Sequence, residues 1–323
     1  MIPARRPSGA FVVLGLGILY VVWGTTYLAI RVAVESIPPF LLAAVTFTLA
    51  GPVLFGIVAL RGGLPEGWPP LRQWVSAVLV GIGLVTFGNG ALSWGEQFVP
   101  SGIASIVVAT VPLWLALLAR AFLGERLRWP AMIGLVLGFA GLVILVAPTV
   151  RRVGDLAGLF AVLLTAIGWA AGSVYSKRAP LPADPFQAAG MQMFCGGLVT
   201  LALALVTGDA ERFDLGRVSM SSKVAFVYLL LAGAILAFGV YQWLVRNASL
   251  SVVGTYAYIN PIVAVGLGAI FLGEPITLRT VIAGVVIVVG VALILAAQAM
   301  GPASHRELLQ PASTTTPEAM HRR

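Results

Sequence analysis

Long apolar stretches separated by short polar connections dominate the chain and predict helices that cross a membrane. Ten such segments are recognised, at about 10–30, 39–60, 74–94, 102–122, 130–147, 156–176, 186–207, 223–244, 251–272 and 280–299. A stretch of roughly 20 apolar residues lets a helix span the hydrocarbon core of a bilayer. Strict alternation of apolar and polar residues is absent, so we interpret the segments as helices and not as the strands of a barrel.

Two short phrases recur at the same spacing. Phe-Leu-Gly-Glu ends at Glu125 and again at Glu274, and a proline precedes each glutamate by the same interval, at Pro112 and Pro261. Self-similarity inside a membrane chain is typical of a transporter built from two structural repeats.

The repeats predict an all-α fold of ten transmembrane helices in two halves. The first five-helix repeat would cover residues 10–147 and the second 156–299, followed by a cytoplasmic tail, 300–323, rich in Ser, Thr and Pro, that we expect to be disordered. Because five crossings is an odd number, the second repeat must enter the membrane from the opposite side. The two repeats are therefore expected to be inverted.

Composition agrees with a membrane protein. The chain is 59% hydrophobic and 10% charged, whereas a soluble domain carries about 25% charged residues. The net charge of +8 would suit binding to nucleic acid in a soluble protein, but the basic residues fall mostly in short connections, and we expect no nucleic acid partner.

The distribution of basic residues indicates the topology. With a cytoplasmic N-terminus, 13 of the 20 Lys and Arg residues lie on the inside, which favours cytoplasmic N- and C-termini. The pair Arg151-Arg152 opposes this orientation.

Catalytic chemistry finds no support in the sequence. Both histidines, His305 and His321, stand in the tail, and a phosphate-binding loop motif is missing. The single Cys195 excludes an internal disulfide and is interpreted as a packing residue. We expect no catalytic residue, no metal site and no cofactor.

Polar and aromatic residues form stripes on several of the apolar segments. Such residues are costly in lipid and are expected to face a cavity or another helix. The third segment has the longest stripe, with Asn89, Ser93 and Glu96 at helical spacing. The predicted substrate-binding residues are Trp23, Thr26, Tyr27, Asn89, Ser93, Glu96, Thr110, Trp114, Trp169, Ser173, Tyr241, Tyr256, Tyr258 and Asn260.

Each of these assignments competes with a structural alternative. Trp23 could belong to an interfacial aromatic belt, Asn89 could make an interhelical hydrogen bond, and Glu96 could be a solvated loop carboxylate. Pro112 and Pro261 are predicted hinges, with a tolerated kink as the alternative. Glu125 and Glu274 are expected to order helix ends and not to bind a ligand.

Several phrases together make the chain similar to one known family. They are WGTTY at 23–27, GNG at 88–90, VPSG at 99–102, VATVP at 108–112, SVY at 173–175, YAY at 256–258 and NP at 260–261, together with the two LGE phrases. The chain resembles the EamA family of the drug/metabolite transporter superfamily over about 10–299, and is most similar to bacterial inner-membrane members. The resemblance implies alternating-access export of small organic metabolites, drugs or amino acids across the bacterial cytoplasmic membrane.

Rival functions remain open from the sequence. A non-transporting structural or signalling membrane protein would have a dry core, whereas a transporter needs a polar cavity. Proton coupling requires Glu96 in the cavity, and a passive facilitator is favoured if Glu96 lies outside it. The expected partners are a small-molecule substrate, the lipid bilayer and protons. Glycines at Gly134, Gly138 and Gly141 mark a scaffold or a dimer face, which leaves a monomer or a homodimer.

Overall fold

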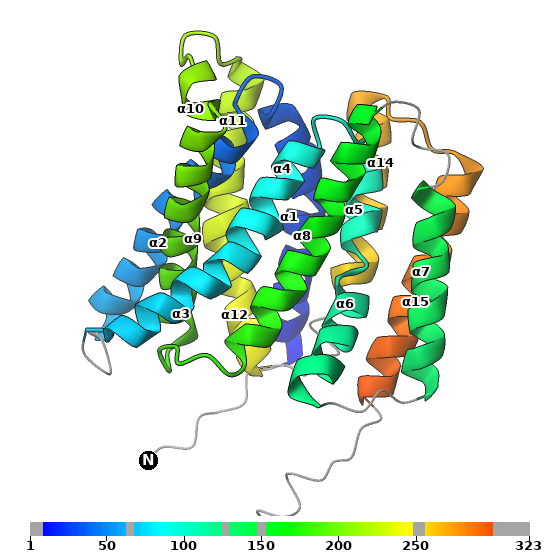
Figure 1. Cartoon of the computed structure of the whole chain (residues 1–323), viewed down its shortest axis with the longest axis horizontal. Helices are drawn as coiled ribbons and strands as arrows, with labels where there is room; N and C mark the ends of the chain where they lie inside the picture. The colour runs from blue at the N-terminus through cyan, green and yellow to red at the C-terminus, as the bar shows by residue number, and fades with distance from the viewer. Residues whose placement is uncertain (1–8, 63–67, 125–128, 147–152, 248–255, 300–323) are drawn as a thin grey trace, which may run out of the picture.

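The structure is a computed structural model that describes residues 9–62, 68–124, 129–146, 153–247 and 256–299, all of them helical or in short connections (Figure 1). In chain order the helices are α1 Gly9–Ala33, α2 Pro39–Gly62, α3 Leu71–Gly81, η1 Ile82–Ala91, α4 Leu92–Gly95, α5 Ser101–Val108, α6 Val111–Leu118, η2 Ala119–Leu123, α7 Trp129–Val146, α8 Val153–Ser176, α9 Pro185–Val206, α10 Asp209–Arg212, α11 Met220–Tyr228, η3 Leu229–Leu236, α12 Ala237–Asn247, α14 Tyr256–Leu272 and α15 Leu278–Ala299. The elements labelled η are π-helical.

Seven of the described helical stretches are long and apolar enough to cross a membrane. Three further apolar helices are shorter within the described residues, at Trp129–Leu145, Ile259–Leu272 and Leu278–Ile294. The prediction of an all-helical, multi-pass membrane protein is confirmed for this part of the chain. Ten crossings remain a prediction.

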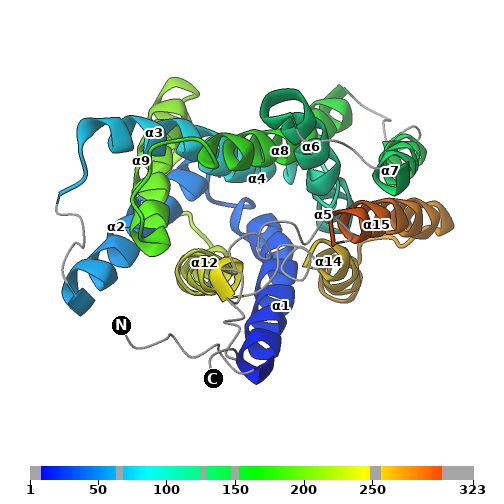
Figure 2. The ribbon, with the colours of Figure 1, turned by 90° about the horizontal axis from the view of Figure 1, so that it is seen from below.

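Corresponding helices of the two halves lie together. α2 packs along α9 and α7 packs along α15, while α1 contacts α14 and α8 contacts α6. Figure 2 shows the α2–α9 pair at one side of the bundle and the α7–α15 pair at the other. In both halves the third helix contains a π-helical stretch, η1 in the first and η3 in the second. The pattern of neighbours is therefore shared by the two halves.

The two halves run in opposite directions. Glu274, just after the end of α14, hydrogen-bonds to Ser101 at the start of α5, and α5 and α14 pack against each other. Helices whose opposite ends meet in this way are antiparallel, although both come from the fourth position of their half. The start of α1 and the end of α15 lie at one end of the bundle (Figure 1). The opposite end, where α1 ends, is called the far end below.

Both Leu-Gly-Glu phrases end a helix in the same way. Gly124 and Gly273 have φ angles of 72° and 64°. This left-handed conformation costs a glycine little because it has no Cβ, and it is the usual way to stop a helix. The phrase repeats because each half needs the same helix stop.

Glycines also bring helices into close contact. A Cβ on Gly134 or Gly141 would meet backbone or side-chain atoms of α15, and a Cβ on Gly138 would meet Leu113. These three glycines therefore serve packing within the chain, which supports their scaffold interpretation over the dimer interpretation.

We predict opposite effects for alanine at two glycines of α2. A Cβ on Gly51 would lie 2.6 Å from the carbonyl oxygen of Gly190 on α9, whereas a Cβ on Gly56 would meet no atom within 4 Å. Gly51→Ala is expected to lower the free energy of unfolding by about 1–3 kcal/mol. Gly56→Ala is the matched control and should be neutral or stabilising by up to about 1 kcal/mol. Unfolding in detergent micelles measures both, and equal effects would contradict the close α2–α9 contact.

Candidate functional site

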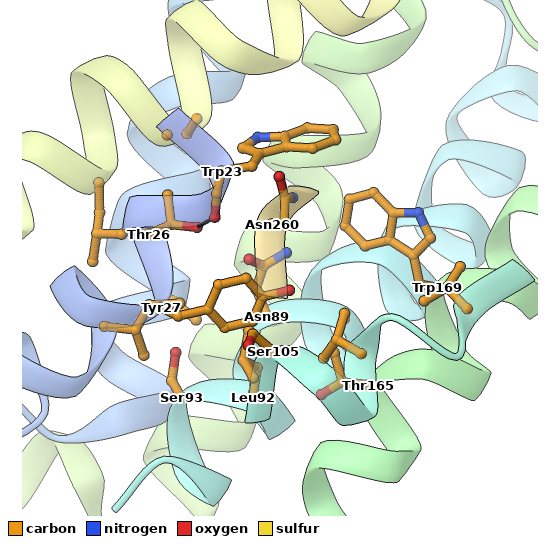
Figure 3. A pocket seen from close by; sticks show the side chains of 18 of the residues that line it. Trp23, Thr26, Tyr27, Asn89, Leu92, Ser93, Ser105, Thr165, Trp169 and Asn260 are labelled. Atoms are coloured by element: carbon orange, nitrogen blue, oxygen red, sulfur yellow. Dashed lines mark hydrogen bonds between the residues drawn. The ribbon is translucent and has the colours of Figure 1, made fainter. Parts of the chain in front are cut away.

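A cavity of about 120 Å³ lies inside the bundle, enclosed by helices of both halves (Figure 3). Its wall is formed by Trp23, Thr26, Tyr27, Ile30, Leu42, Ala43, Thr46, Phe47, Gly88, Asn89, Leu92, Ser93, Ser105, Val108, Ala109, Val111, Thr165, Trp169, Leu229, Gly233, Ala234, Phe238, Tyr256, Ala257, Asn260 and Pro261. The π-helical stretches η1 and η3 both contribute to this wall. Such stretches are frequent at functional sites.

Aromatic rings dominate one part of the wall. The ring of Trp23, near the middle of α1, lies 6.2 Å from that of Trp169, 5.8 Å from that of Phe238 and 5.1 Å from that of Tyr256. The contacts are edge-to-face, the arrangement that the ring quadrupoles favour. Trp23 and Trp169 hold matching places in the two halves, and together they form an aromatic wall across the boundary between the halves.

The polar part of the wall consists of amides and hydroxyls. Asn89 donates a 2.9 Å hydrogen bond from its side-chain nitrogen to the carbonyl of Leu84. Asn260 is 5% exposed, and among the described residues its side-chain oxygen Oδ1 has no hydrogen-bond partner. The Thr26 hydroxyl donates to the carbonyl of Trp23 at 2.7 Å. Figure 3 shows these side chains directed into the same space as the two tryptophans.

The backbone of α14 is itself modified where it meets the cavity. Pro261 stands inside α14 and lines the wall. Because proline has no N–H, it cannot complete the helical hydrogen bond to the carbonyl of Ala257, which also lines the wall. Pro112 occupies the first turn of α6, directly after the break at Ala109 and Thr110 that separates α5 from α6. Each half thus has a proline close to the cavity, one beside a broken helix and one in a continuous helix.

Charged groups collect at the far end, outside the cavity wall. Glu96 follows the third span, which ends at Gly95. It is 0% exposed, and neither carboxylate oxygen has a partner among the described residues. Arg31 donates a hydrogen bond to the backbone carbonyl of Glu96 and not to its carboxylate. Burial, and then the charge of Glu274, raise the pKa of Glu96 well above its ordinary value of 4.5, while Arg31 opposes this shift.

Glu274 caps the helix that begins the fourth span. Its Oε1 accepts the Ser101 backbone N–H at 2.8 Å, and its Oε2 accepts the Gly102 N–H at 3.0 Å. The Ser101 hydroxyl lies 2.9 Å from Oε1 and 3.0 Å from Oε2. A carboxylate at a helix N-terminus satisfies N–H groups that the helix leaves unpaired. The prediction that Glu274 orders a helix end is confirmed, and the helix belongs to the other half of the chain. Glu125, for which the same role was predicted, lies outside the described residues.

Comparison with known proteins decides the family. The model of the EamA-like transporter family matches residues 9–147 and 156–296. The uncharacterized inner membrane transporter YedA of Escherichia coli (strain K12) is 38% identical over 286 residues, which cover 88% of this chain and 90% of that protein. The chain belongs to the EamA-like transporter family.

Other similar proteins match most of the chain. The uncharacterized transporter YvbV of Bacillus subtilis (strain 168) is 29% identical over 280 residues, 85% of this chain and 88% of that protein. One solved crystal structure superposes with a TM-score of 0.62 at 24% identity, covering 91% of this chain and all of that one. At that identity the likeness concerns the fold alone.

The fold brings eight of the fourteen predicted binding residues together in the wall of one cavity. They are Trp23, Thr26, Tyr27, Asn89, Ser93, Trp169, Tyr256 and Asn260. The hydrogen bond that Asn89 donates to Leu84 stays within its own helix and is not the interhelical bond of the structural alternative.

The other predicted residues lie elsewhere. Glu96 is buried at the far end, which also differs from a solvated loop carboxylate. Thr110 is fully buried and accepts a 3.3 Å hydrogen bond from the Trp114 ring nitrogen, and Ser173 donates to the carbonyl of Trp169 at 2.7 Å. Tyr241 packs behind the wall, with its ring 5.2 Å from that of Trp23. The side chain of Tyr258 lies outside the described part.

The second span also lines the cavity, and the sequence analysis did not include it. Leu42, Ala43, Thr46 and Phe47 belong to the wall. Thr46 is 4% exposed and donates to the carbonyl of Leu42 at 2.7 Å. Thr46 and Thr48 stand two positions apart, on different faces of the helix, and make no stripe. The pattern of polar positions therefore carried no signal for this helix.

Proposed function

We propose that the chain is a secondary transporter that moves a small organic molecule across the bacterial inner membrane by alternating access. The observation that carries the proposal is a cavity lined by both EamA repeats, with Trp23 and Trp169 contributed from matching places. A site shared by two inverted repeats becomes accessible from either side when one repeat rocks against the other. Export is the direction that the family resemblance implies.

A ligand-stabilisation screen followed by a transport assay tests this function. A solute that binds the folded protein raises its apparent stability by mass action. We expect a solute found in this way to enter or leave proteoliposomes that contain the protein and not empty ones. Binding without any translocation would instead support the structural or signalling alternative. Translocation that no proton gradient can drive uphill would support the passive facilitator.

Cysteine labelling tests the cavity residues. In a Cys195→Ala background, we predict that Trp23→Cys, Asn89→Cys and Trp169→Cys react with a water-soluble thiosulfonate. A cavity that admits substrate also admits water, and water lets the introduced cysteine ionise to the reactive thiolate. Phe160→Cys is the matched control, since Phe160 is 60% exposed on the outer face of α8 and would face lipid. Mass spectrometry gives the labelled fraction. Labelling of Phe160→Cys together with inertness of all three cavity positions would refute the site.

We further propose ten crossings with both termini in the cytoplasm. The start of α1 and the end of α15 lie at one end of the bundle, which supports an even number of crossings (Figure 1). Reporter fusions after Gly154 and Gly301 are expected to give opposite sides, with Gly301 cytoplasmic. The same side for both fusions would exclude five crossings per repeat.

A further inference from the structure

The cavity wall is aromatic and polar but carries no formal charge in the described residues. Its polar groups are amides, hydroxyls and indole nitrogens, from side chains such as Asn89, Asn260 and Thr165. Glu96 and Arg31, two of the charged residues at the far end, are not part of the wall. A solute in this cavity therefore finds hydrogen-bonding groups and rings but no counter-ion on the described wall.

An ion would bind poorly in such a place. A cation could use the faces of Trp23, Trp169 or Tyr256, but a buried cation–π contact typically strengthens binding by only about 30-fold. Taking an unpaired ion out of water weakens binding by more than about 100-fold. For an anion, the described wall offers neutral N–H and O–H donors but no basic side chain. At the N-terminus of α6, Pro112 has no N–H to offer. Desolvation therefore outweighs the available attraction for either sign of charge.

An uncharged ring fits the wall better. The rings of Trp23, Trp169, Phe238 and Tyr256 offer edges and faces to a planar aromatic molecule. The Asn260 oxygen is buried in the wall without a partner among the described residues. A buried acceptor of this kind favours a ligand that brings an N–H or O–H donor, because leaving it unpaired is costly.

We propose that the cavity selects an uncharged, planar aromatic solute that carries at least one N–H or O–H donor. The proposal rests on the proposed transport function for the fate of the solute, and not for its binding. Asn260 supplies the acceptor for the donor, and the two tryptophans enclose the ring.

Three solutes of one shape but different charge test the proposal. Benzamide is neutral, benzoate is an anion and benzylammonium is a cation, and all three carry one phenyl ring. Thermal stabilisation of the purified protein at neutral pH is expected to show benzamide binding at least about tenfold more tightly than either ion. Tighter or equal binding of an ion, or no stabilisation by any of the three, overturns the proposal.

Substitution of Asn260 isolates the hydrogen bond. Asn260→Leu is expected to weaken benzamide binding about tenfold while toluene, which has no donor, binds no more weakly. Thr207→Val, which removes a hydroxyl at the end of α9 away from the wall, should leave both affinities unchanged. An equal loss for benzamide and toluene would mean that Asn260 only shapes the cavity, and would overturn its role as acceptor.

A transport assay separates this proposal from the proposed function. Radiolabelled benzamide that binds but does not cross proteoliposomes would refute transport and leave the chemical class intact. A charged solute that is transported, while benzamide neither binds nor crosses, would uphold transport and overturn the class.

Discussion

Glu274→Ala is expected to lower the free energy of unfolding by about 3 kcal/mol and to loosen the far end of the bundle. The substitution removes both acceptors of the Ser101 and Gly102 N–H groups. Those two residues are buried, so water would not fully replace the carboxylate. Hydrogen bonds to a charged group contribute about 1.5–3 kcal/mol each, so two of them would contribute about 3–6 kcal/mol. Because Glu274 is partly exposed, we expect the loss to lie at the lower end of this sum.

A double-mutant cycle distinguishes the cap from a general loss of charge. Ser101→Ala removes the hydroxyl that contacts both carboxylate oxygens. Its effect should be smaller once Glu274 is alanine, giving a coupling energy of about 0.5–2 kcal/mol. Glu211→Ala is the control, because Glu211 is an exposed glutamate on α10, and its effect should stay within about 0.5 kcal/mol. Additive effects of the Ser101 and Glu274 substitutions would contradict the cap.

This cap has a consequence for transport. Glu274 belongs to the second repeat and Ser101 to the first, so the hydrogen bonds join the two repeats at one end of the bundle. If the repeats rock against each other, this contact must change when the far end opens. Glu274→Ala should therefore shift the protein toward the conformation that is open at the far end. A distance measured between labels on α5 and α14 would report that shift.

The general architecture could be predicted from the sequence because lipid enforces it. Apolar segments of sufficient length specify helices, and the repeated Leu-Gly-Glu phrase specifies two related halves. Trp23, Asn89 and Trp169 could be predicted to meet because isolated polar or aromatic residues in apolar helices must face the interior. The family resemblance added the class of function.

The rest depends on contacts between distant segments. The partner of Glu274 lies 173 residues earlier in the chain, and no local pattern marks Ser101 as its target. Thr110 and Ser173 have the same polar character as the wall residues, and their hydroxyls bond locally just as that of Thr26 in the wall does. Spacing indicates which face a residue occupies, whereas only the packed structure shows whether that face meets the cavity or another helix.

Glu96 lies outside the cavity wall, which favours a passive facilitator over proton coupling by direct contact with substrate, so coupling through Glu96 would have to be indirect. From the sequence, Glu96 is predicted to be a substrate-binding residue of the cavity, where its carboxylate would meet substrate directly. In the structure it is enclosed at the far end, beside Tyr27 and Arg31 of α1 and within the field of Glu274. A proton on Glu96 would then respond to opening of the far end and not to contact with substrate. Hydration on opening would favour the ionised form and release the proton.

Glu96→Gln is expected to abolish accumulation driven by a pH gradient while solute exchange without a gradient persists. Glutamine resembles the protonated acid in size and hydrogen bonding but cannot titrate. The comparison uses proteoliposomes with and without an imposed pH gradient. Glu35→Gln is the matched control, because Glu35 is an exposed glutamate just after α1 and should leave both activities unchanged.

The pH dependence of stability gives a second measurement that needs no substrate. The pKa of Glu96 is higher in the folded protein than its ordinary value of 4.5, so the folded state keeps a proton that the unfolded state has released. Between these two pKa values stability must fall as pH rises, by up to about 1.4 kcal/mol per pH unit. Glu96→Gln should remove this fall, so that wild type and variant diverge as pH rises above 4.5. If the stabilities of wild type and Glu96→Gln run parallel from pH 5 to pH 8 and gradient-driven transport is unchanged, Glu96 carries no transported proton. The far end would then be held closed by Glu274 and Arg31 without a contribution from that proton.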